Sequence, residues 1–175
     1  RRFQYRRIEQ IPTWKVDHSF STNSKIAFYF GMQRTRKDNG QDGLPDPISQ
    51  RRDQPITSKT IRVNRDYFFT PTMINHFGIG YQRYYNPDTT PITDYDSASE
   101  LGLRGAVVGG FPRITFNAPV ASDNLGPTNY QLYTQDKPTI VETFSWVRKS
   151  HTFKFGGEYR IDPFNNLANN GATGT

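Results

Sequence analysis

Histidines and reactive side chains are the first candidates for chemistry in this chain of 175 residues. His18, His76 and His151 are its only histidines, and no HExxH motif or paired spacing brings two of them onto one face of an element. Cysteine is absent, and no serine, histidine and acidic residue form the pattern of a nucleophilic triad. No pair of carboxylates lies in an apolar setting. We therefore expect no enzymatic activity, no catalytic residue, no bound metal and no cofactor.

Acidic and glycine-rich stretches are two further candidates. Residues 38–46 contain three aspartates spaced four residues apart, which resembles a calcium loop, but Gly40 stands at a ligand position and Ser49 replaces the bidentate glutamate. We expect turns built on Asx and glycine residues there instead. Gly78 and Gly80 do not belong to a GxGxxG or P-loop motif. As alternate residues of one strand, they would let another part of the protein approach that strand face closely.

Basic and aromatic residues are interleaved at 1–7 and 82–85, a pattern that can bind single-stranded nucleic acid by stacking. The formal net charge is +6, from 22 lysines and arginines against 16 acidic residues. These charges are spread along the chain, and the same residue types suit a membrane rim, where tyrosine lies at the interface and arginine contacts lipid phosphates. We favour the rim and expect no nucleic-acid partner.

The elements that hold these residues are predicted to be strands, because polar and apolar residues alternate with a period of two over segments of about ten residues. Six such segments lie at 13–20, 25–36, 60–69, 74–84, 139–147 and 151–161. Aromatic and β-branched side chains fill one face of each segment and polar side chains fill the other. Arg65 and Phe68 are exceptions, since each falls on the face that does not match its type.

One face of these strands is expected to contact lipid. Only 34% of the residues are hydrophobic, yet 14% are aromatic, which is too little aliphatic material for a thick soluble core but enough for an apolar surface one residue deep. No segment of about 18 apolar residues could form a transmembrane helix. The residues expected to face lipid are Trp14, Val16, Phe20, Ile26, Phe28, Phe30, Ile61, Val63, Phe77, Ile79, Tyr81, Phe144, Trp146, Phe153, Phe155 and Tyr159.

Short and long connections alternate along the chain. Three or four residues join the strands of each pair, whereas the links near 37–58 and 85–138 are long and rich in Gly, Pro, Asp and Asn. Compact soluble domains rarely contain such loops, but transmembrane barrels have short turns at one rim and long loops at the other. The predicted fold is all-β: an antiparallel up-and-down transmembrane β-barrel segment of about six strands in three hairpins, open because incomplete. We expect the chain to be a piece of a longer one.

Four stretches follow one another in a specific order and spacing that covers nearly the whole chain. They are WKVDHSFS at 14–21, FTPTMIN at 69–75 with Gly80-Tyr81 following, GFPRITF at 110–116, and WVRKSHTFKFGGEYR at 146–160. Together they resemble the barrel of TonB-dependent receptors of the Oar-like type.

The resemblance implies that residues 1–175 are a partial receptor barrel domain in the bacterial outer membrane. Such barrels have about 22 strands, are closed by a plug and are energised through the TonB complex; the plug domain and the TonB box are absent from this chain. The implied function is import of a solute, whose identity the sequence does not give. The implied partners are outer-membrane lipid, lipopolysaccharide and the TonB complex, which would be reached through the missing N-terminal parts.

The ligand is expected to contact Phe111, Pro112 and Arg113 in the long second loop, because loops held on a rigid scaffold usually carry binding residues. Two alternatives stay open. A secreted soluble all-β module that binds a glycan or polyanion would bury one strand face against a second sheet. A passive porin-like barrel would keep the lipid-facing surface but have no plug and no coupling to TonB.

Overall fold

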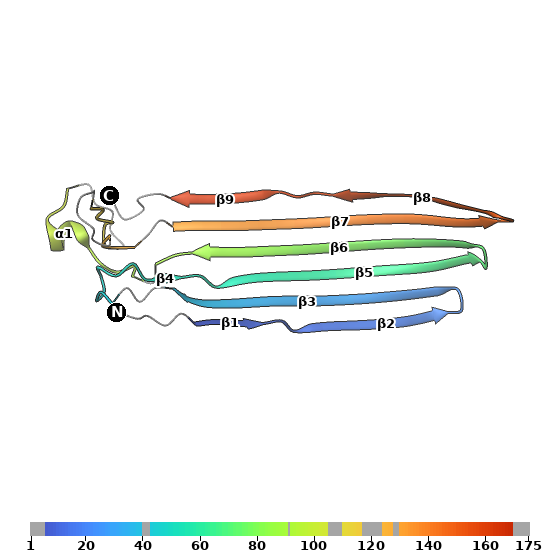
Figure 1. Cartoon of the computed structure of the whole chain (residues 1–175), viewed down its shortest axis with the longest axis horizontal. Coiled ribbons are helices and arrows are strands. Elements are labelled where there is room, and N and C mark those ends of the chain that lie inside the picture. Colours follow the sequence, from blue (N-terminus) through green and yellow to red (C-terminus); the bar gives the residue numbers. More distant parts are fainter. Residues whose placement is uncertain are drawn as a thin grey trace.

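The computed structural model describes residues 6–39, 43–90, 92–104, 110–116, 124–127 and 130–169. These residues form one antiparallel sheet and one short helix. The elements are β1 (Arg6–Gln10), β2 (Thr13–Ser21), β3 (Ser24–Asn39), β4 (Arg52–Asp53), β5 (Ile56–Thr70), β6 (Met73–Asp88), α1 (Ser97–Leu101), β7 (Tyr130–Arg148), β8 (His151–Arg160) and β9 (Phe164–Asn169). The long strands lie side by side, α1 lies at one end and the tight turns lie at the other (Figure 1).

One edge of the sheet is a single strand that a proline interrupts. β1 and β2 both pair with β3, and the register is the same on the two sides of Pro12. Pro12 has no N–H to donate, although its carbonyl still accepts a hydrogen bond from the Met32 N–H at 3.0 Å. The strand predicted at 13–20 is therefore longer than its alternation indicated.

The opposite edge is built in the same way. β8 and β9 both pair with β7 in one register, and Pro163 lies between them. Pro138 of β7 faces this interruption and also lacks an N–H, so the ladder retains only the bond from the Ile161 N–H to the Pro138 carbonyl, at 3.2 Å. The missing donors explain why the strand stops at Arg160 and resumes at Phe164.

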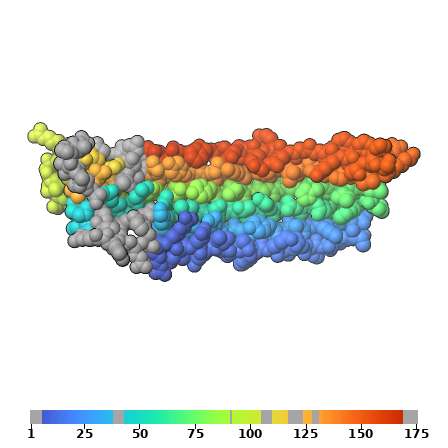
Figure 2. Space-filling model, in the orientation of Figure 1, coloured from blue at the N-terminus to red at the C-terminus, as the bar shows by residue number. Residues whose placement is uncertain are grey.

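The sheet order confirms the predicted fold class. Counting β1 with β2, β4 with β5 and β8 with β9, the nine strands reduce to six, which form three antiparallel hairpins that follow one another in chain order. In the space-filling view they appear as adjacent bands from blue to red (Figure 2). The β1–β2 strand and the β8–β9 strand are not paired with each other in the described part of the chain, so the sheet is open.

Each hairpin closes with a two-residue turn, at 22–23, 71–72 and 149–150. Lys149 has a φ of 53°, the left-handed conformation that tight hairpin turns use. The turns are staggered, because the Phe68 N–H bonds the Asn23 carbonyl and the Val147 N–H bonds the Thr72 carbonyl, both at 2.9 Å. Each hairpin thus extends beyond the turn before it (Figure 1). A stagger in one direction is what closure of a sheet into a barrel requires.

The side chains predicted to face lipid lie on one face of the sheet, which we call the apolar face; the other is the polar face. Strand pairing aligns them in rows, one of which contains Val16, Phe28, Val63, Ile79, Ile140 and Tyr159. No second layer covers them: Ile79 is 46% and Phe155 58% exposed. Among the described residues, Ile92 and Phe111 alone are buried hydrophobic side chains, so the strands enclose no apolar core of their own.

Two charged side chains interrupt the apolar face. Arg65 lies opposite Phe77, and Glu142 lies opposite Phe77 on its other side. Both lean toward the tight turns: the Arg65 guanidinium lies 4.9 Å from the ring centroid of Tyr67, and Glu142 accepts a hydrogen bond from Asn75 Nδ2 at 3.1 Å. Long side chains that reach toward an interface lower the cost of placing charge on a lipid-facing surface.

The strands are longer at the loop end than the alternation predicted. The link expected at 85–138 is reduced to 89–129, because β6 continues to Asp88 and β7 begins at Tyr130. The link expected at 37–58 is also shorter and contains β4. The prediction stopped too early because these outer parts keep the backbone ladder but lose the regular apolar alternation.

The long connections fold onto the ends of the strands. We call the described parts of 43–55 and 89–127 the loop cluster. Asp53 and Thr89 exchange two backbone hydrogen bonds of 2.7 and 3.0 Å, and the Gly126 N–H donates to the Ile48 carbonyl at 2.8 Å. Phe111 is buried there against Tyr95, with ring centroids 5.5 Å apart. No helix in the described ranges is long and apolar enough to cross a membrane.

Candidate functional site

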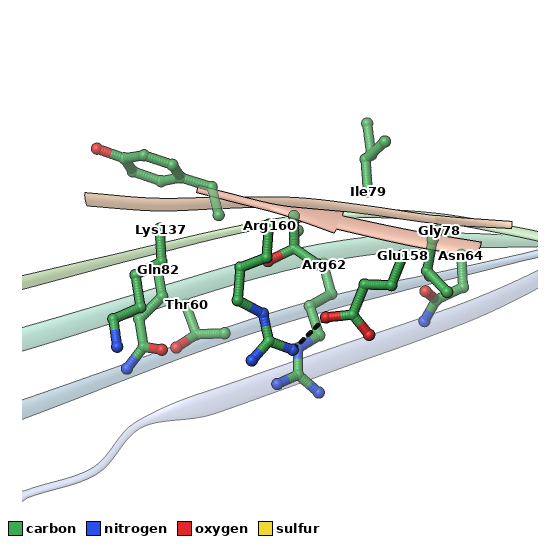
Figure 3. A pocket seen from close by; sticks show the side chains of 13 residues that line it. Thr60, Arg62, Asn64, Gly78, Ile79, Gln82, Lys137, Glu158 and Arg160 are labelled. Carbon is green, nitrogen blue, oxygen red and sulfur yellow. Dashed lines mark ion pairs between the residues drawn. The ribbon is translucent and has the colours of Figure 1, made fainter. Parts of the chain in front are cut away.

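A groove of about 410 Å³ lies on the polar face over the middle of β5, β6, β7 and β8. Its walls are polar and charged side chains of β5, β7 and β8, and its floor includes two glycines of β6. Arg62, Glu158 and Arg160 all project to the same side of the sheet, whereas Ile79 projects to the apolar side (Figure 3). The groove is therefore a property of the polar face alone.

Strand pairing brings together groove residues that are distant in the sequence. Arg62 lies opposite Gly80, Gly80 opposite Thr139, and Thr139 opposite Arg160. Adjacent strands are about 4.8 Å apart, so the backbones of the two arginines are separated by roughly 14 Å. Short side chains lie between them. This row therefore forms a low floor with a guanidinium group on each side.

The charge of the groove is predominantly positive. Arg160 forms an ion pair with Glu158 of the same strand, and Lys137 Nζ lies 3.1 Å from Asp162 Oδ2. Arg62 is exposed and forms no ion pair with any residue that the structure describes. The first ion pair is solvent-exposed and the second is half-buried on the side of Lys137, so the first contributes little to stability. Arg62 is thus the cation available to a carboxylate or phosphate that enters the groove.

The two glycines of the floor have different surroundings. A Cβ atom on Gly78 would lie 2.7 Å from Asn64 Oδ1 and 2.8 Å from Val141 Cγ1, so neighbouring side chains already occupy that space. The nearest atom to a Cβ on Gly80 is Arg62 Cγ at 3.6 Å, an ordinary contact distance. We predicted that another segment could approach both glycines closely. The space for such a segment is free above Gly80 but is filled above Gly78.

The three histidines lie apart from one another. His76 faces Asp66 across the β5–β6 pair on the polar face, with Nδ1 2.6 Å from Oδ1. His18 and His151 lie close to tight turns, where each contacts a phenylalanine ring. Within the ranges that the structure describes, no group of three or more His, Cys, Asp or Glu side chains could hold a metal ion.

The aspartate-rich stretch at 38–46 is only partly visible. Residues 40–42 lie outside the described residues, and so does the expected turn at Gly40. Asp46, which the structure does describe, forms an ion pair with Arg51 at 3.4 Å. Its carboxylate is therefore engaged within the loop cluster.

The residues predicted to contact the ligand lie in the loop cluster. Phe111 is 5% exposed and Pro112 is buried, whereas Arg113 is half-buried and its Nε has no hydrogen-bond partner. Phe111 packs against Tyr95 within the cluster. Contact of this trio with a ligand stays a prediction; Arg113 is the member that keeps accessible surface, although its unpaired Nε atom is itself buried.

The sequence did not single out the groove residues as a set. Alternation placed Arg62, Glu158 and Arg160 on the polar faces of their strands, and this was the available signal. Their proximity depends on the register between strands of different hairpins. No local pattern in the sequence encodes that register.

The sheet and the groove define a wall of a membrane β-barrel: an exposed apolar face, a grooved and charged opposite face, tight turns at one rim and folded loops at the other. A family model described as an outer membrane beta barrel domain matches residues 4–175. The chain belongs to that family, and its location is the bacterial outer membrane. No curated protein and no solved structure matches the chain.

Proposed function

We propose that this chain is part of the wall of an energised outer-membrane transporter, a TonB-dependent receptor of the Oar-like type that imports a solute. In this arrangement the apolar face contacts lipid and the polar face lines the lumen. The tight turns then lie at the periplasmic rim and the loop cluster at the extracellular rim. The observation that carries the proposal is the groove on the polar face.

The groove favours a lumen that is filled by protein. Gly80 leaves an open floor, and Arg62 offers a guanidinium without an ion pair among the described residues. A plug segment that carries an acidic side chain could lie on this floor and bind Arg62 by a charge-assisted hydrogen bond. A water-filled channel also needs polar side chains, but it gains nothing from a glycine floor.

The proposal includes partners that lie outside this chain. An N-terminal plug and TonB box would connect the barrel to the TonB complex of the inner membrane. Outer-membrane lipid and lipopolysaccharide would surround the wall, and the imported solute would enter past the loop cluster, with Arg113 as one candidate contact. We propose a transport role and no enzymatic one.

A passive porin-like barrel is the second candidate, and the exposed apolar face supports it equally. The soluble all-β module is disfavoured. Such a module would bury Phe28, Phe77 or Phe155 under a second sheet, whereas all three are exposed on the apolar face. A test must therefore separate a filled lumen from an open one.

An introduced cysteine can report whether the lumen is filled, because these 175 residues contain none and any cysteine elsewhere in the full-length protein can first be replaced by serine. Gly80→Cys puts a thiol on the groove floor, where no atom lies closer than 3.6 Å to the new Cβ. We expect a charged, membrane-impermeant maleimide to label this thiol slowly in the full-length protein in outer-membrane vesicles. Labelling should become roughly tenfold faster when urea unfolds the plug.

Thr93→Cys is the matched control, because Thr93 is exposed in the loop cluster. This thiol should react at the same fast rate with and without urea. Fast labelling of Gly80→Cys before urea is added, together with steady potassium chloride conductance in planar bilayers, would establish the open porin and contradict the plugged transporter.

A further inference from the structure

Cations lie at the loop-cluster end of the apolar rows on three neighbouring strands of the apolar face. The apolar rows end toward the loop cluster. The first residue of that face beyond them is Arg34 on β3, Lys59 on β5 and Arg83 on β6. All three side chains are exposed. We call these residues the outer basic cluster.

The arrangement of the outer basic cluster is electrostatically unfavourable by itself. Lys59 lies directly opposite Arg83, and Arg34 is the diagonal neighbour of Lys59 because it pairs with Thr57. Like charges that face each other directly across a strand pair repel and destabilise the pair. The sequence thus retains one directly opposed pair of like charges with a third cation diagonal to it, and an external anion would relieve this repulsion.

Acidic side chains of the sheet do not neutralise the cluster. Asp136 is the acidic group that reaches it: its Oδ1 lies 3.8 Å from Arg83 Nε and also accepts a hydrogen bond from the Tyr81 hydroxyl. Arg34 and Lys59 form no ion pair within the part of the chain that the structure describes. Three cations therefore share one carboxylate.

We propose that the outer basic cluster binds the phosphate of an anionic outer-leaflet lipid headgroup, one whose phosphate charge no choline or other cation of the same lipid neutralises. The site lies where the apolar rows end, which is the level at which a lipid carries its phosphate above its acyl chains. Opposed side chains on a sheet have Cβ atoms about 5 Å apart, so one phosphate can bridge Lys59 and Arg83. Arginine adds planar, paired donors that match phosphate oxygens.

This proposal rests on the orientation in which the apolar face contacts lipid, and not on energised transport. Two lipids carry the required chemistry: the phosphorylated glycolipid part of lipopolysaccharide and an anionic glycerophospholipid. Their acyl chains would cover the same apolar rows. The two sources can be separated by supplying each one alone.

The experiment measures lipid retention by the full-length protein. The protein is reconstituted in phosphatidylcholine nanodiscs that contain either lipid A or phosphatidylglycerol, and bound lipid is counted by native mass spectrometry after detergent exchange. We expect the variant with Lys59→Gln and Arg83→Gln to retain roughly tenfold less lipid A or phosphatidylglycerol than the unmodified protein, with no change in retained phosphatidylcholine. A preference for lipid A or for phosphatidylglycerol identifies the source.

Arg65→Gln is the matched control, because Arg65 lies on the same strand and the same face but on the side of the tight turns. It should retain lipid as the unmodified protein does. Equal retention by the double variant, or an equal loss in Arg65→Gln, would overturn the proposal. Either result would leave the labelling of Gly80→Cys unchanged, so this proposal and the proposed function fail separately.

Thermal stability supplies a second readout. Its dependence on the lipid distinguishes binding of a headgroup by Lys59 from a purely structural role of Lys59 in the sheet. In phosphatidylcholine alone, whose phosphate is neutralised by the choline of the same headgroup, Lys59→Gln should raise the midpoint of unfolding, because it removes the repulsion with Arg83. In lipid A or phosphatidylglycerol, the same substitution should lower it, because an anionic ligand is lost. The same direction of shift in both lipids would contradict a bound phosphate.

Discussion

The Arg52 guanidinium holds both carboxylate oxygens of Asp88, and this pair fixes β4 to the loop end of β6. The Asp88 side chain is 5% exposed and the Arg52 side chain 37% exposed. Burial lowers the pKa of Arg52, so the charged guanidinium is disfavoured there unless an anion offsets its desolvation. The pair therefore anchors the loop cluster to the barrel wall.

Asp88→Ala should loosen that anchor. The loss of a charge-assisted pair that leaves the guanidinium half-buried costs about 2 kcal/mol. The two backbone bonds between Asp53 and Thr89 lie next to it, so their hydrogen-exchange protection should fall roughly 30-fold. Asp94→Ala removes an exposed carboxylate from the same loop cluster and should leave that protection unchanged. Unchanged protection in Asp88→Ala would show that the anchor lies elsewhere.

Neighbouring residues of β7 can test which face meets lipid. Ile140 lies on the apolar face and is 49% exposed, whereas Val141 lines the groove on the polar face. Ile140→Arg should destabilise the folded barrel in phosphatidylcholine vesicles by about 2–4 kcal/mol, because the charge enters hydrocarbon. Val141→Arg places the same side chain in the lumen and should cost clearly less. Equilibrium unfolding in urea measures both, and equal costs would refute the assignment of faces.

The two glycines of the groove floor should differ in their tolerance of alanine. Gly78→Ala forces a methyl group against Asn64 and Val141 and should cost about 1–3 kcal/mol by overpacking. Gly80→Ala meets no atom within 3.6 Å and should change the free energy of unfolding by less than about 0.5 kcal/mol. Comparison of the two urea midpoints checks the difference, and similar costs would mean that the neighbours of Gly78 relax freely.

Acidification should release the first turn of α1. Asp96 caps this helix by accepting hydrogen bonds from the Ala98 N–H at 3.1 Å and the Ser99 N–H at 3.2 Å. Hydrogen bonding by Ser99, first through its side chain and second through its backbone N–H, is the main reason that the pKa of Asp96 lies below its ordinary value of 3.8. A depressed carboxyl pKa contributes stability above the ordinary value, and that stability is lost as the pH falls through the folded-state value.

Protection of the Ala98 and Ser99 amides should therefore hold at neutral pH and decline below 3.8. Asp96→Asn is the control, since an amide oxygen still caps the helix but does not titrate. Its protection factors should be independent of pH over the same interval. A decline of equal size in Asp96→Asn would assign the effect to another group.

Several features of the wall could be read from the sequence because they depend on local alternation. The pattern around Phe28, Phe77 and Phe153 assigned each side chain to its face, since successive residues of a strand point to opposite sides whatever the strand pairs with. The tight turns followed from the polar residues between alternating segments. Their positions in the alternation also predicted the faces of Arg65 and Phe68 correctly, although neither side chain matches the type of its face.

Features that depend on pairing could not be read in this way. Pro12 and Pro163 are visible in the sequence, but only the register shows that each interrupts a continuous edge strand. The outer ends of β6 and β7 were missed because a backbone ladder needs no apolar alternation to persist.

The sequence by itself therefore determined the fold class, the two faces of the strands and the order of the hairpins. The tertiary structure alone decided which side chains share a site: Arg62 and Arg160 on the two sides of the groove, and Lys59 opposite Arg83 on the other face. The physical reason is that face alternation is set within one strand, whereas a contact between strands depends on register, and a shift of one residue would exchange every partner.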